Sequence, residues 1–206
     1  MHKKVRFDPP YDSPIEEQFV WHFEKYVDKD VELLSQFEIL TSHGNFKMDF
    51  VIKNGLKLIG IECDGKDYHH IWRDIWRDIA ILENSDVIEV FRFRGSDITY
   101  HINECLLVLS WYYSELFDHR GIQNLKILAD KEILNDDFYN NRNESLIEFN
   151  YRGFEEEYNK LKIWRINTCF FNYEKTAKLI NSNPSLKIDQ LYEKYKTIVR
   201  DDLGFA

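Results

Sequence analysis

Apolar and polar positions follow two different periods along the first half of the chain. Residues 13–27 carry apolar side chains at helical spacing, with Asp12 or Ser13 as the N-cap and Pro14 in the first turn, which predicts a helix. Three shorter apolar runs follow, at residues 31–40, 45–52 and 56–63. Short turns containing Gly and Asn separate these runs, so we predict three consecutive strands, most simply an antiparallel meander.

The helical period returns after the third predicted strand. Residues 70–83 place isoleucines and a leucine on one stripe, which predicts an amphipathic helix. Residues 86–93 form a fourth strand-like run, and Ser96 is placed to cap a long helix that continues to residue 116. The predicted order is αβββαβα, an α/β fold with a mixed central sheet.

The sequence becomes more polar and richer in asparagine beyond residue 120. Three segments there have the pattern of amphipathic helices, at residues 154–164, 172–182 and 186–199. We therefore predict a core at residues 1–120 and a C-terminal helical appendage at residues 121–206. The apolar side chains of the last helix are expected to pack on the core or on a partner.

Composition limits the class of protein without choosing a function. The chain has 206 residues, of which 44% are hydrophobic and 16% aromatic, as expected of a folded domain. Its three cysteines have no CxxC spacing, and no apolar stretch typical of a signal peptide follows the N-terminal charges. We expect a cytoplasmic protein without an export signal or a membrane anchor.

The net charge of −9 argues against a protein that coats nucleic acid by electrostatic attraction. Basic residues nevertheless gather in the sequence around the acidic residues described next: Lys47, Lys66, Arg73, Arg77, Arg92 and Arg94. An enzyme that contacts nucleic acid only locally therefore remains compatible with the charge.

Three carboxylates occur on or at the ends of two apolar, strand-like runs. Asp49 lies in the second run, and Glu62 and Asp64 close the third in the sequence "IGIECDG". Side chains alternate faces along a strand, so Glu62 and Asp64 share one face, and the hairpin can bring Asp49 beside them. Clusters of oxygen ligands suit hard divalent cations such as Mg²⁺ or Mn²⁺, which would offset the cost of placing charge there.

Each carboxylate taken alone also has a structural explanation. Asp49 could solvate the edge of a strand, and Glu62 could be a buried acid paired with Arg92 or Lys47. The combination of all three carboxylates favours a metal site that activates water and stabilises charge on a phosphodiester.

Five blocks of the sequence carry a resemblance: "SPIEEQF", "KMDFVI", "LIGIECDGKDYH", "RDIWRDIAIL" and "VIEVFRFRGSDI". Together they resemble the very-short-patch-repair-endonuclease-like branch of the PD-(D/E)XK restriction-endonuclease superfamily. The resemblance covers residues 13 to about 115, and the blocks occur in the order that this branch uses. It implies a restriction-endonuclease-like core, whose αβββαβα order agrees with the elements predicted above.

The resemblance implies roles for the matching acidic residues. Asp49 corresponds to the central metal ligand, and Glu62 to the second acidic motif residue. The backbone carbonyl of Cys63 would also face the metal. Glu16 corresponds to the acidic residue of the first helix that faces the metal, with Glu17 beside it expected to be exposed.

The residues after the third strand depart from the wider superfamily. Asp64 stands where lysine is often found, although the similar branch has an acid and a glycine there, followed by histidine. His69 matches that histidine and is the candidate for proton transfer or for positioning water, since its ordinary pKa is near neutrality. The alternative interpretation is that His69 only caps a helix or lies where the chain enters one. Lys66 is the second candidate for the missing lysine.

The basic residues have two interpretations. Arg73 and Arg77 recur at i and i+4, as do Asp74 and Asp78, which alone indicates a solvated face with ion pairs. In a nuclease, these arginines would bind phosphates or hold the acidic cluster. Lys47, Arg92 and Arg94 are likewise candidates for DNA contacts, and Arg92 alternatively for neutralising Glu62.

The sequence therefore predicts a Mg²⁺- or Mn²⁺-dependent nuclease that hydrolyses DNA, in repair, restriction or defence against mobile DNA. The first alternative is a catalytically silent binding or assembly subunit of a DNA-processing complex, and the second is an RNA nuclease. A zinc site formed by Cys63, His69, His70 and Cys105 is a more distant alternative. The helical C-terminal region is a candidate surface for a protein partner or a homodimer.

Overall fold

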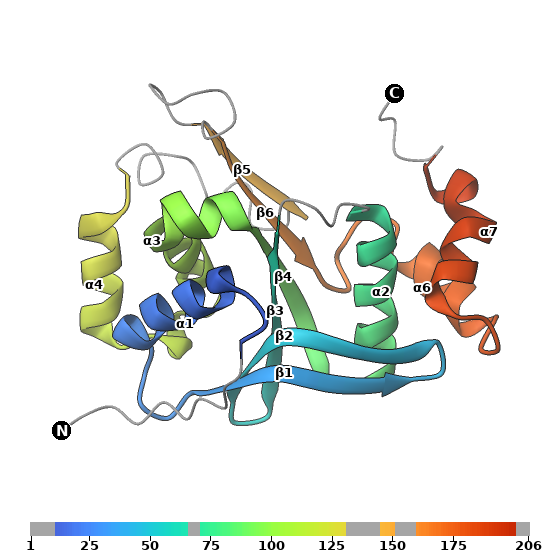
Figure 1. Ribbon diagram of the computed structural model, residues 1–206, viewed down its shortest axis with the longest axis horizontal. Helices are drawn as coiled ribbons and strands as arrows, with labels where there is room; N and C mark the ends of the chain where they lie inside the picture. The colour runs from blue at the N-terminus through green and yellow to red at the C-terminus, as the bar shows by residue number, and fades with distance from the viewer. Residues whose placement is uncertain (1–10, 66–70, 131–144, 151–159, 201–206) are drawn as a thin grey trace.

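A mixed β-sheet with helices on both faces forms the framework of the protein (Figure 1). The computed structural model describes residues 11–65, 71–130, 145–150 and 160–200. The strands are β1 (Glu32–Thr41), β2 (Gly44–Asn54), β3 (Lys57–Asp64), β4 (Val87–Arg94), β5 (Leu146–Asn150) and β6 (Lys160–Ile166). The helices are α1 (Pro14–Tyr26), α2 (Ile71–Asn84), α3 (Gly95–Tyr112), α4 (His119–Leu128), α6 (Tyr173–Asn181) and α7 (Ile188–Arg200), with a short 3₁₀ turn η1 (Ser114–Leu116).

The first seven elements occur in the predicted order α1, β1, β2, β3, α2, β4, α3. Strands β1, β2 and β3 form the predicted antiparallel meander. Gly55 has a φ of +61° in the tight turn between β2 and β3, a conformation that glycine adopts without steric cost. The crossover through α2 then makes β4 parallel to β3, so the sheet is mixed.

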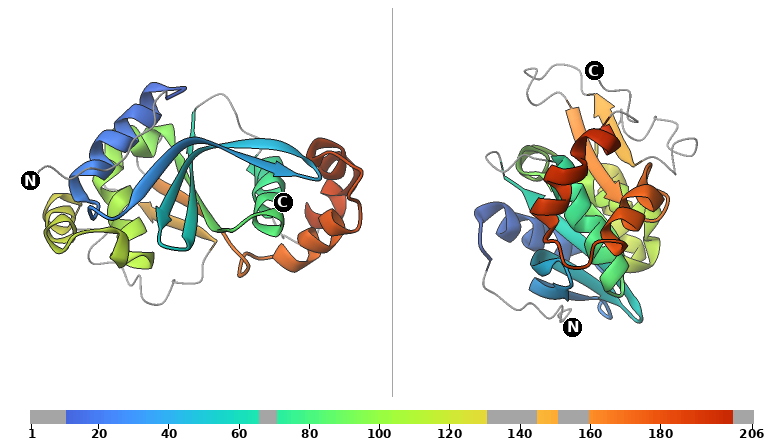
Figure 2. Two further views of the ribbon diagram at one scale, coloured as in Figure 1. Left: turned by 90° about the horizontal axis from the view of Figure 1, so that it is seen from below. Right: turned by 90° about the vertical axis from the view of Figure 1, so that its right-hand side faces the viewer.

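Two apolar layers cover the two faces of the sheet, as the views in Figure 2 show. Helices α1, α3 and α4 pack on one face around a cluster that includes Phe19, Phe23 and Leu106. Helices α2, α6 and α7 pack on the other face around Ile79 and Leu191. The central strands read as almost continuous apolar runs because both of their faces are buried.

The predicted C-terminal helical appendage needs a correction. Residues 172–182 and 186–199 do contain helices, α6 and α7, but the predicted helix at 154–164 is wrong for its last part. Residues from Lys160 form β6, which pairs with β4 and carries β5 at the edge of the central sheet. Leu161 and Ile163 are buried in β6 with less buried residues between them, a two-residue period that charged neighbours obscured in the sequence.

The C-terminal helices attach to α2 through aromatic contacts. Trp76 stacks on Tyr195 with parallel rings and meets Tyr192 edge-on. The buried ring of His43, in the turn before β2, lies 2.8 Å through Nδ1 from the carbonyl oxygen of Leu186. The last helix therefore packs on α2, and a partner at this region stays a prediction. In the described part of the chain, no helix is long and apolar enough to cross a membrane.

Gly121 allows α4 to touch the end of α1. A Cβ atom added to Gly121 would lie 2.3 Å from the carbonyl oxygen of Tyr26 and 2.9 Å from its Cα. We expect Gly121→Ala to lower the free energy of unfolding by about 1–3 kcal/mol, because the backbone must shift. Helix propensity alone would give the opposite sign, a gain of about 1 kcal/mol.

Urea unfolding measures this difference. Gly65→Ala is the control, since its Cβ would meet nothing within 4 Å and should change the stability by less than about 0.5 kcal/mol. A Gly121→Ala protein as stable as the parent would show that α4 does not approach α1 this closely.

Candidate active site

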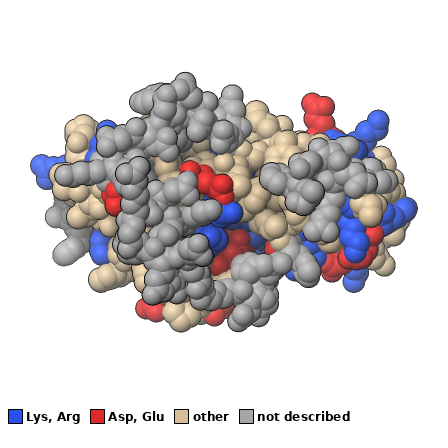
Figure 3. Space-filling model, turned by 90° about the horizontal axis from the view of Figure 1, so that it is seen from above, with Lys and Arg blue, Asp and Glu red and all other residues tan. Residues whose placement is uncertain are grey.

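A cavity of about 360 Å³ lies where α1 and α2 begin and where β3 and β4 end. Its walls include Asp12, Ser13, Ile15, Glu16, Asp49, Glu62, Cys63, Asp64, Gly65, Arg73, Asp74, Arg77 and Arg92. Acidic and basic side chains meet in a hollow in the middle of the face shown in Figure 3. Six acids against three arginines leave an excess of negative charge in the wall.

The structure brings most of the residues predicted for the site to this cavity. Glu16, Asp49, Glu62 and Asp64 reach it from α1, β2 and β3, and the arginines at 73, 77 and 92 line it as well. Two basic candidates lie outside its lining: Lys47 pairs with Asp12 at 2.6 Å, and Arg94 makes two hydrogen bonds to Asp97. Lys66 and His69 lie outside the described residues, so their predicted roles are untested.

Asp49 is held at the point where the β2–β3 ladder stops. The last paired residues are Phe50 and Ile61, and beyond them Asp49 Oδ2 accepts a hydrogen bond of 2.7 Å from the backbone N–H of Cys63. Burial and the neighbouring Glu62 raise the pKa of Asp49 to about 8, although this hydrogen bond opposes the shift. The carboxyl therefore lies where additional negative charge is disfavoured and a cation would be favoured.

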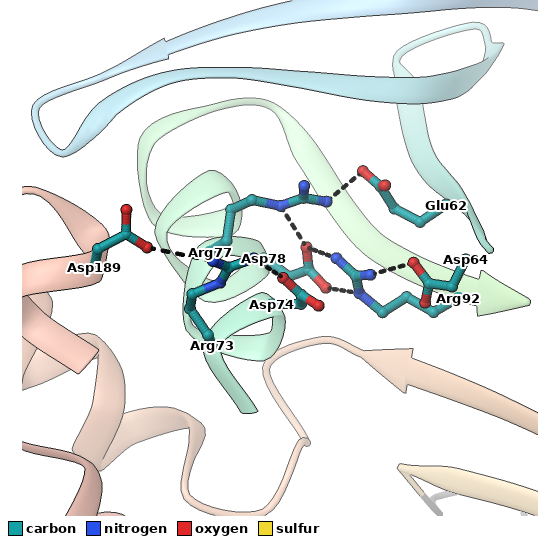
Figure 4. A network of polar contacts seen from close by, with 8 residues as sticks. All are labelled: Glu62, Asp64, Arg73, Asp74, Arg77, Asp78, Arg92 and Asp189. Atoms are coloured by element: carbon teal, nitrogen blue, oxygen red, sulfur yellow. Dashed lines mark hydrogen bonds and ion pairs between the residues drawn. The ribbon is translucent and has the colours of Figure 1, made fainter. Parts of the chain in front are cut away.

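Glu62 is buried in the wall, with only 5% of its surface exposed. Its Oε1 lies 2.6 Å from Nη2 of Arg77, as Figure 4 shows. The N–H groups are not directed at this oxygen, so Glu62 Oε1 and Arg77 Nη2 form an ion pair without a hydrogen bond. Burial raises the pKa of Glu62, while Arg77 and Arg92 oppose that shift.

The environment of Arg92 differs from that of Arg77, because the side chain of Arg92 is only 2% exposed. It makes hydrogen bonds of 2.6 and 3.1 Å to the buried Asp78 and one of 2.7 Å to Asp64. The partner of Glu62 is therefore Arg77 rather than Arg92 or Lys47. With its guanidinium covered in this way, Arg92 is better suited to hold the wall than to contact DNA.

Arg73, Asp74 and Arg77 of α2 line the cavity, and Asp78, the fourth member of the repeat, is buried without being part of its lining. Asp78 is completely buried and Asp74 nearly so, which differs from the solvated face that the pattern alone indicated. Arg73 is the most exposed of the arginines in the wall and lies 3.5 Å from Asp74 and 3.9 Å from Asp189 of α7. Asp78 holds Arg92 in place through two hydrogen bonds, a role that the sequence did not indicate because Asp78 was interpreted only as part of the charged face.

Glu16 is the acid of α1 that faces the site, as predicted, and Glu17 beside it is exposed. Ser13 caps the helix, since its Oγ accepts from the backbone N–H of Glu16, and the same hydroxyl donates a hydrogen bond of 2.7 Å to Glu16 Oε1. Glu16 Oε2 accepts from the backbone of Asp12 and, at 2.7 Å, from Gln36 Nε2.

Gln36 was not identified from the sequence as a residue that contacts the candidate site. It lies in β1 between the paired residues Ser35 and Phe37, opposite Asp49, and has a φ of +50°. This left-handed conformation is costly for a residue with a Cβ, and it directs the amide to Glu16. Nothing in the local sequence distinguishes this glutamine from an ordinary strand residue.

The donors in the cavity fit a hard cation in chemical type, since Glu16, Asp49, Glu62 and Asp64 offer only oxygen. The buried Glu62 Oε1 also lacks a hydrogen-bond donor. In the described residues, however, no three His, Cys, Asp or Glu side chains are arranged to hold a metal ion. Their oxygens are turned toward Ser13, Gln36, the Cys63 N–H and Arg77 instead.

Comparison of the chain with known proteins does not assign it to a family. No family model matches the sequence, no curated protein matches it, and no solved structure matches it.

The raised pKa of Asp49 predicts a pH dependence of stability. Its pKa is about 8 in the folded protein, against about 3.9 in an unfolded chain. Between these two pH values Asp49 is protonated in the folded protein but ionised in the unfolded chain. The free energy of unfolding therefore decreases as the pH rises toward 8. We expect Asp49→Asn to gain stability relative to the parent over this window, by up to about 1.4 kcal/mol per pH unit.

Urea unfolding in EDTA at pH 5, 6, 7 and 8 measures this effect. The buried Asp97 pairs with Arg94 away from the cavity, and burial raises its pKa as well, so Asp97→Asn is the comparison for a buried carboxyl outside the cavity. Parallel stability curves for the parent and Asp49→Asn would contradict the raised pKa.

The left-handed backbone at Gln36 predicts the order of two substitutions. Gln36→Ala and Gln36→Gly both lose the hydrogen bond to Glu16, but only alanine keeps a Cβ at a φ of +50°. We expect the glycine variant to be more stable than the alanine variant by about 1 kcal/mol. Thermal unfolding of the two proteins compares them directly, and an alanine variant of equal or greater stability would exclude the strained conformation.

Proposed function

We propose that the protein is a divalent-metal-dependent nuclease that hydrolyses DNA phosphodiester bonds, of the very-short-patch-repair-endonuclease-like branch of the PD-(D/E)XK superfamily. One observation carries the proposal: Glu16, Asp49 and Glu62, which come from three separate elements, line one cavity. The α/β order and the parallel β3–β4 pair are consistent with such a core.

In this proposal Asp49, Glu62 and the Cys63 carbonyl hold Mg²⁺ or Mn²⁺, and Glu16 assists through water. When bound, the metal supplies Lewis-acid stabilisation of the phosphate and a more acidic water. Asp49 must give up its proton to take part, which the cation would favour by lowering its pKa. His69 would accept the proton of the attacking water, with Lys66 as the second candidate.

The arginines would bind the substrate backbone. Arg73 is the best placed for a flanking phosphate, since 43% of its side chain is exposed at the cavity wall. Arg77 is closer to the acids and suits the phosphate at the reacting bond. Local positive charge of this kind allows an acidic chain to bind nucleic acid at one place, provided that a cation offsets the carboxylates.

A catalytically silent subunit that uses the same surface for binding is the second candidate. The contact between Arg77 and Glu62 favours it, because an arginine there already neutralises a predicted metal ligand. RNA is the alternative substrate for the same chemistry, and a protein partner could supply affinity for either nucleic acid.

The experiment is a cleavage assay with labelled single- and double-stranded DNA, and RNA alongside, in Mg²⁺, Mn²⁺ or EDTA. We expect metal-dependent cutting of DNA by the parent protein. Asp49→Ala should remain folded and lose at least about 100-fold in rate, because a ligand of the cation is gone.

Asp97→Asn is again the matched control, as a buried aspartate that does not line the cavity. It should cut at a rate close to that of the parent. Circular dichroism confirms that each variant is folded. The absence of cutting by a folded parent protein with either metal would favour the silent subunit, and equal cutting by Asp49→Ala would refute this site.

A further inference from the structure

Two arginines neutralise acids in the cavity wall in different ways (Figure 4). Arg92 is fixed by three directed hydrogen bonds to Asp78 and Asp64 and is almost inaccessible. Arg77 contacts Glu62 at 2.6 Å and Asp78 at 3.6 Å, yet its Nε and Nη2 atoms have no hydrogen-bond partner. The first arginine is fixed by directed hydrogen bonds, and the second by short ion contacts with poor alignment.

This difference affects how readily each arginine can leave its acid. A directed, charge-assisted hydrogen bond is much stronger than an ion contact with poor alignment. Arg77 also has 24% of its side chain exposed and lies in the wall of the cavity, so its guanidinium has a place to move. Arg92 also lines the cavity, but its side chain is only 2% exposed and its guanidinium is held by three hydrogen bonds.

When ionised, Glu62 needs a counter-ion, because a buried, unpaired carboxylate is costly. In the described residues its Oε1 has no aligned hydrogen-bond donor, and it lies 2.6 Å from Nη2 of Arg77. A divalent cation at this oxygen would repel the guanidinium and replace it as the neutralising charge.

We propose that Arg77 is an exchangeable counter-ion of Glu62, which a divalent cation displaces and which then binds the phosphate of the substrate. This inference rests on the proposed function. It makes metal and substrate binding reinforce each other, since a phosphate that attracts Arg77 leaves Glu62 free for the cation, and the reverse. It also accounts for carboxylates that line one cavity without a ready-made coordination geometry.

The first test measures the binding of Mn²⁺ alone to the full chain by calorimetry. Arg77→Gln should bind Mn²⁺ about tenfold more tightly than the parent, because the competing cation is gone. Arg73→Gln removes an arginine of the same helix face that does not contact Glu62, and should stay within about twofold. Unchanged or weaker binding by Arg77→Gln would overturn the exchange.

The loss of Arg77 leaves Glu62 unpaired and could unfold the protein in EDTA. In that case circular dichroism is recorded as Mn²⁺ is added. Recovery of the folded signal in Arg77→Gln supports the exchange, since the cation then takes over the role of the guanidinium. A variant that stays unfolded at saturating Mn²⁺ shows that Arg77 is a permanent structural partner like Arg92, which overturns it.

Catalysis gives an independent readout of the substrate contact. Arg77→Gln should lower kcat/KM for DNA while binding Mn²⁺ more tightly, a combination that a merely structural role would not produce. Asp49→Asn separates the two proposals. If it binds Mn²⁺ as well as the parent, or the parent binds none, both proposals fail; if binding needs Asp49 but is not tightened in Arg77→Gln, only the exchange fails.

Discussion

The buried ion pair between Arg92 and Asp78 is the interaction on which the cavity depends. It joins β4 to α2, and a third hydrogen bond to Asp64 adds the end of β3. Removal of one partner of a buried pair leaves an uncompensated charge and typically costs about 3–5 kcal/mol. The pair therefore fixes α2 against the sheet. Arg73 and Arg77 belong to the same helix, so this contact, together with the apolar packing of α2, sets where they lie relative to the carboxylates.

The parallel pairing of β3 with β4 decides where the reactive groups gather. Since both strands end at the same edge of the sheet, Glu62, Asp64 and Arg92 lie side by side there. The antiparallel β2 runs in the opposite direction. Its Asp49 accepts a hydrogen bond from the Cys63 N–H just beyond the last paired residues of β2 and β3. Helix α1 directs its first turn, with Glu16, to the same place. Four elements thus converge because of the order of the strands, rather than because of any local sequence motif.

The sequence predicted the order of the first seven elements and the acids that line the cavity, because hydrophobic period and strand alternation are local properties. It failed at β6, where the charges around Leu161 and Ile163 resemble those of an exposed helix, and only pairing with β4 explains a strand. It also indicated Arg92 or Lys47 as the partner of Glu62, whereas the partner is Arg77, which only the tertiary structure brings to this carboxylate. Gln36 could not be identified, since its left-handed φ is a property of the folded backbone.

The charge of the cavity imposes a condition on any anionic substrate. Its wall has more carboxylates than arginines, and the protein as a whole is negative, so a phosphate is repelled until a cation reduces that field. An arginine bound to an acid contributes little attraction to a distant anion, because the two charges cancel. The same arginine becomes useful once another cation neutralises its acid. A cavity of this composition would therefore attract an anionic substrate only after a cation had bound, and net charge alone is a poor guide to its substrate.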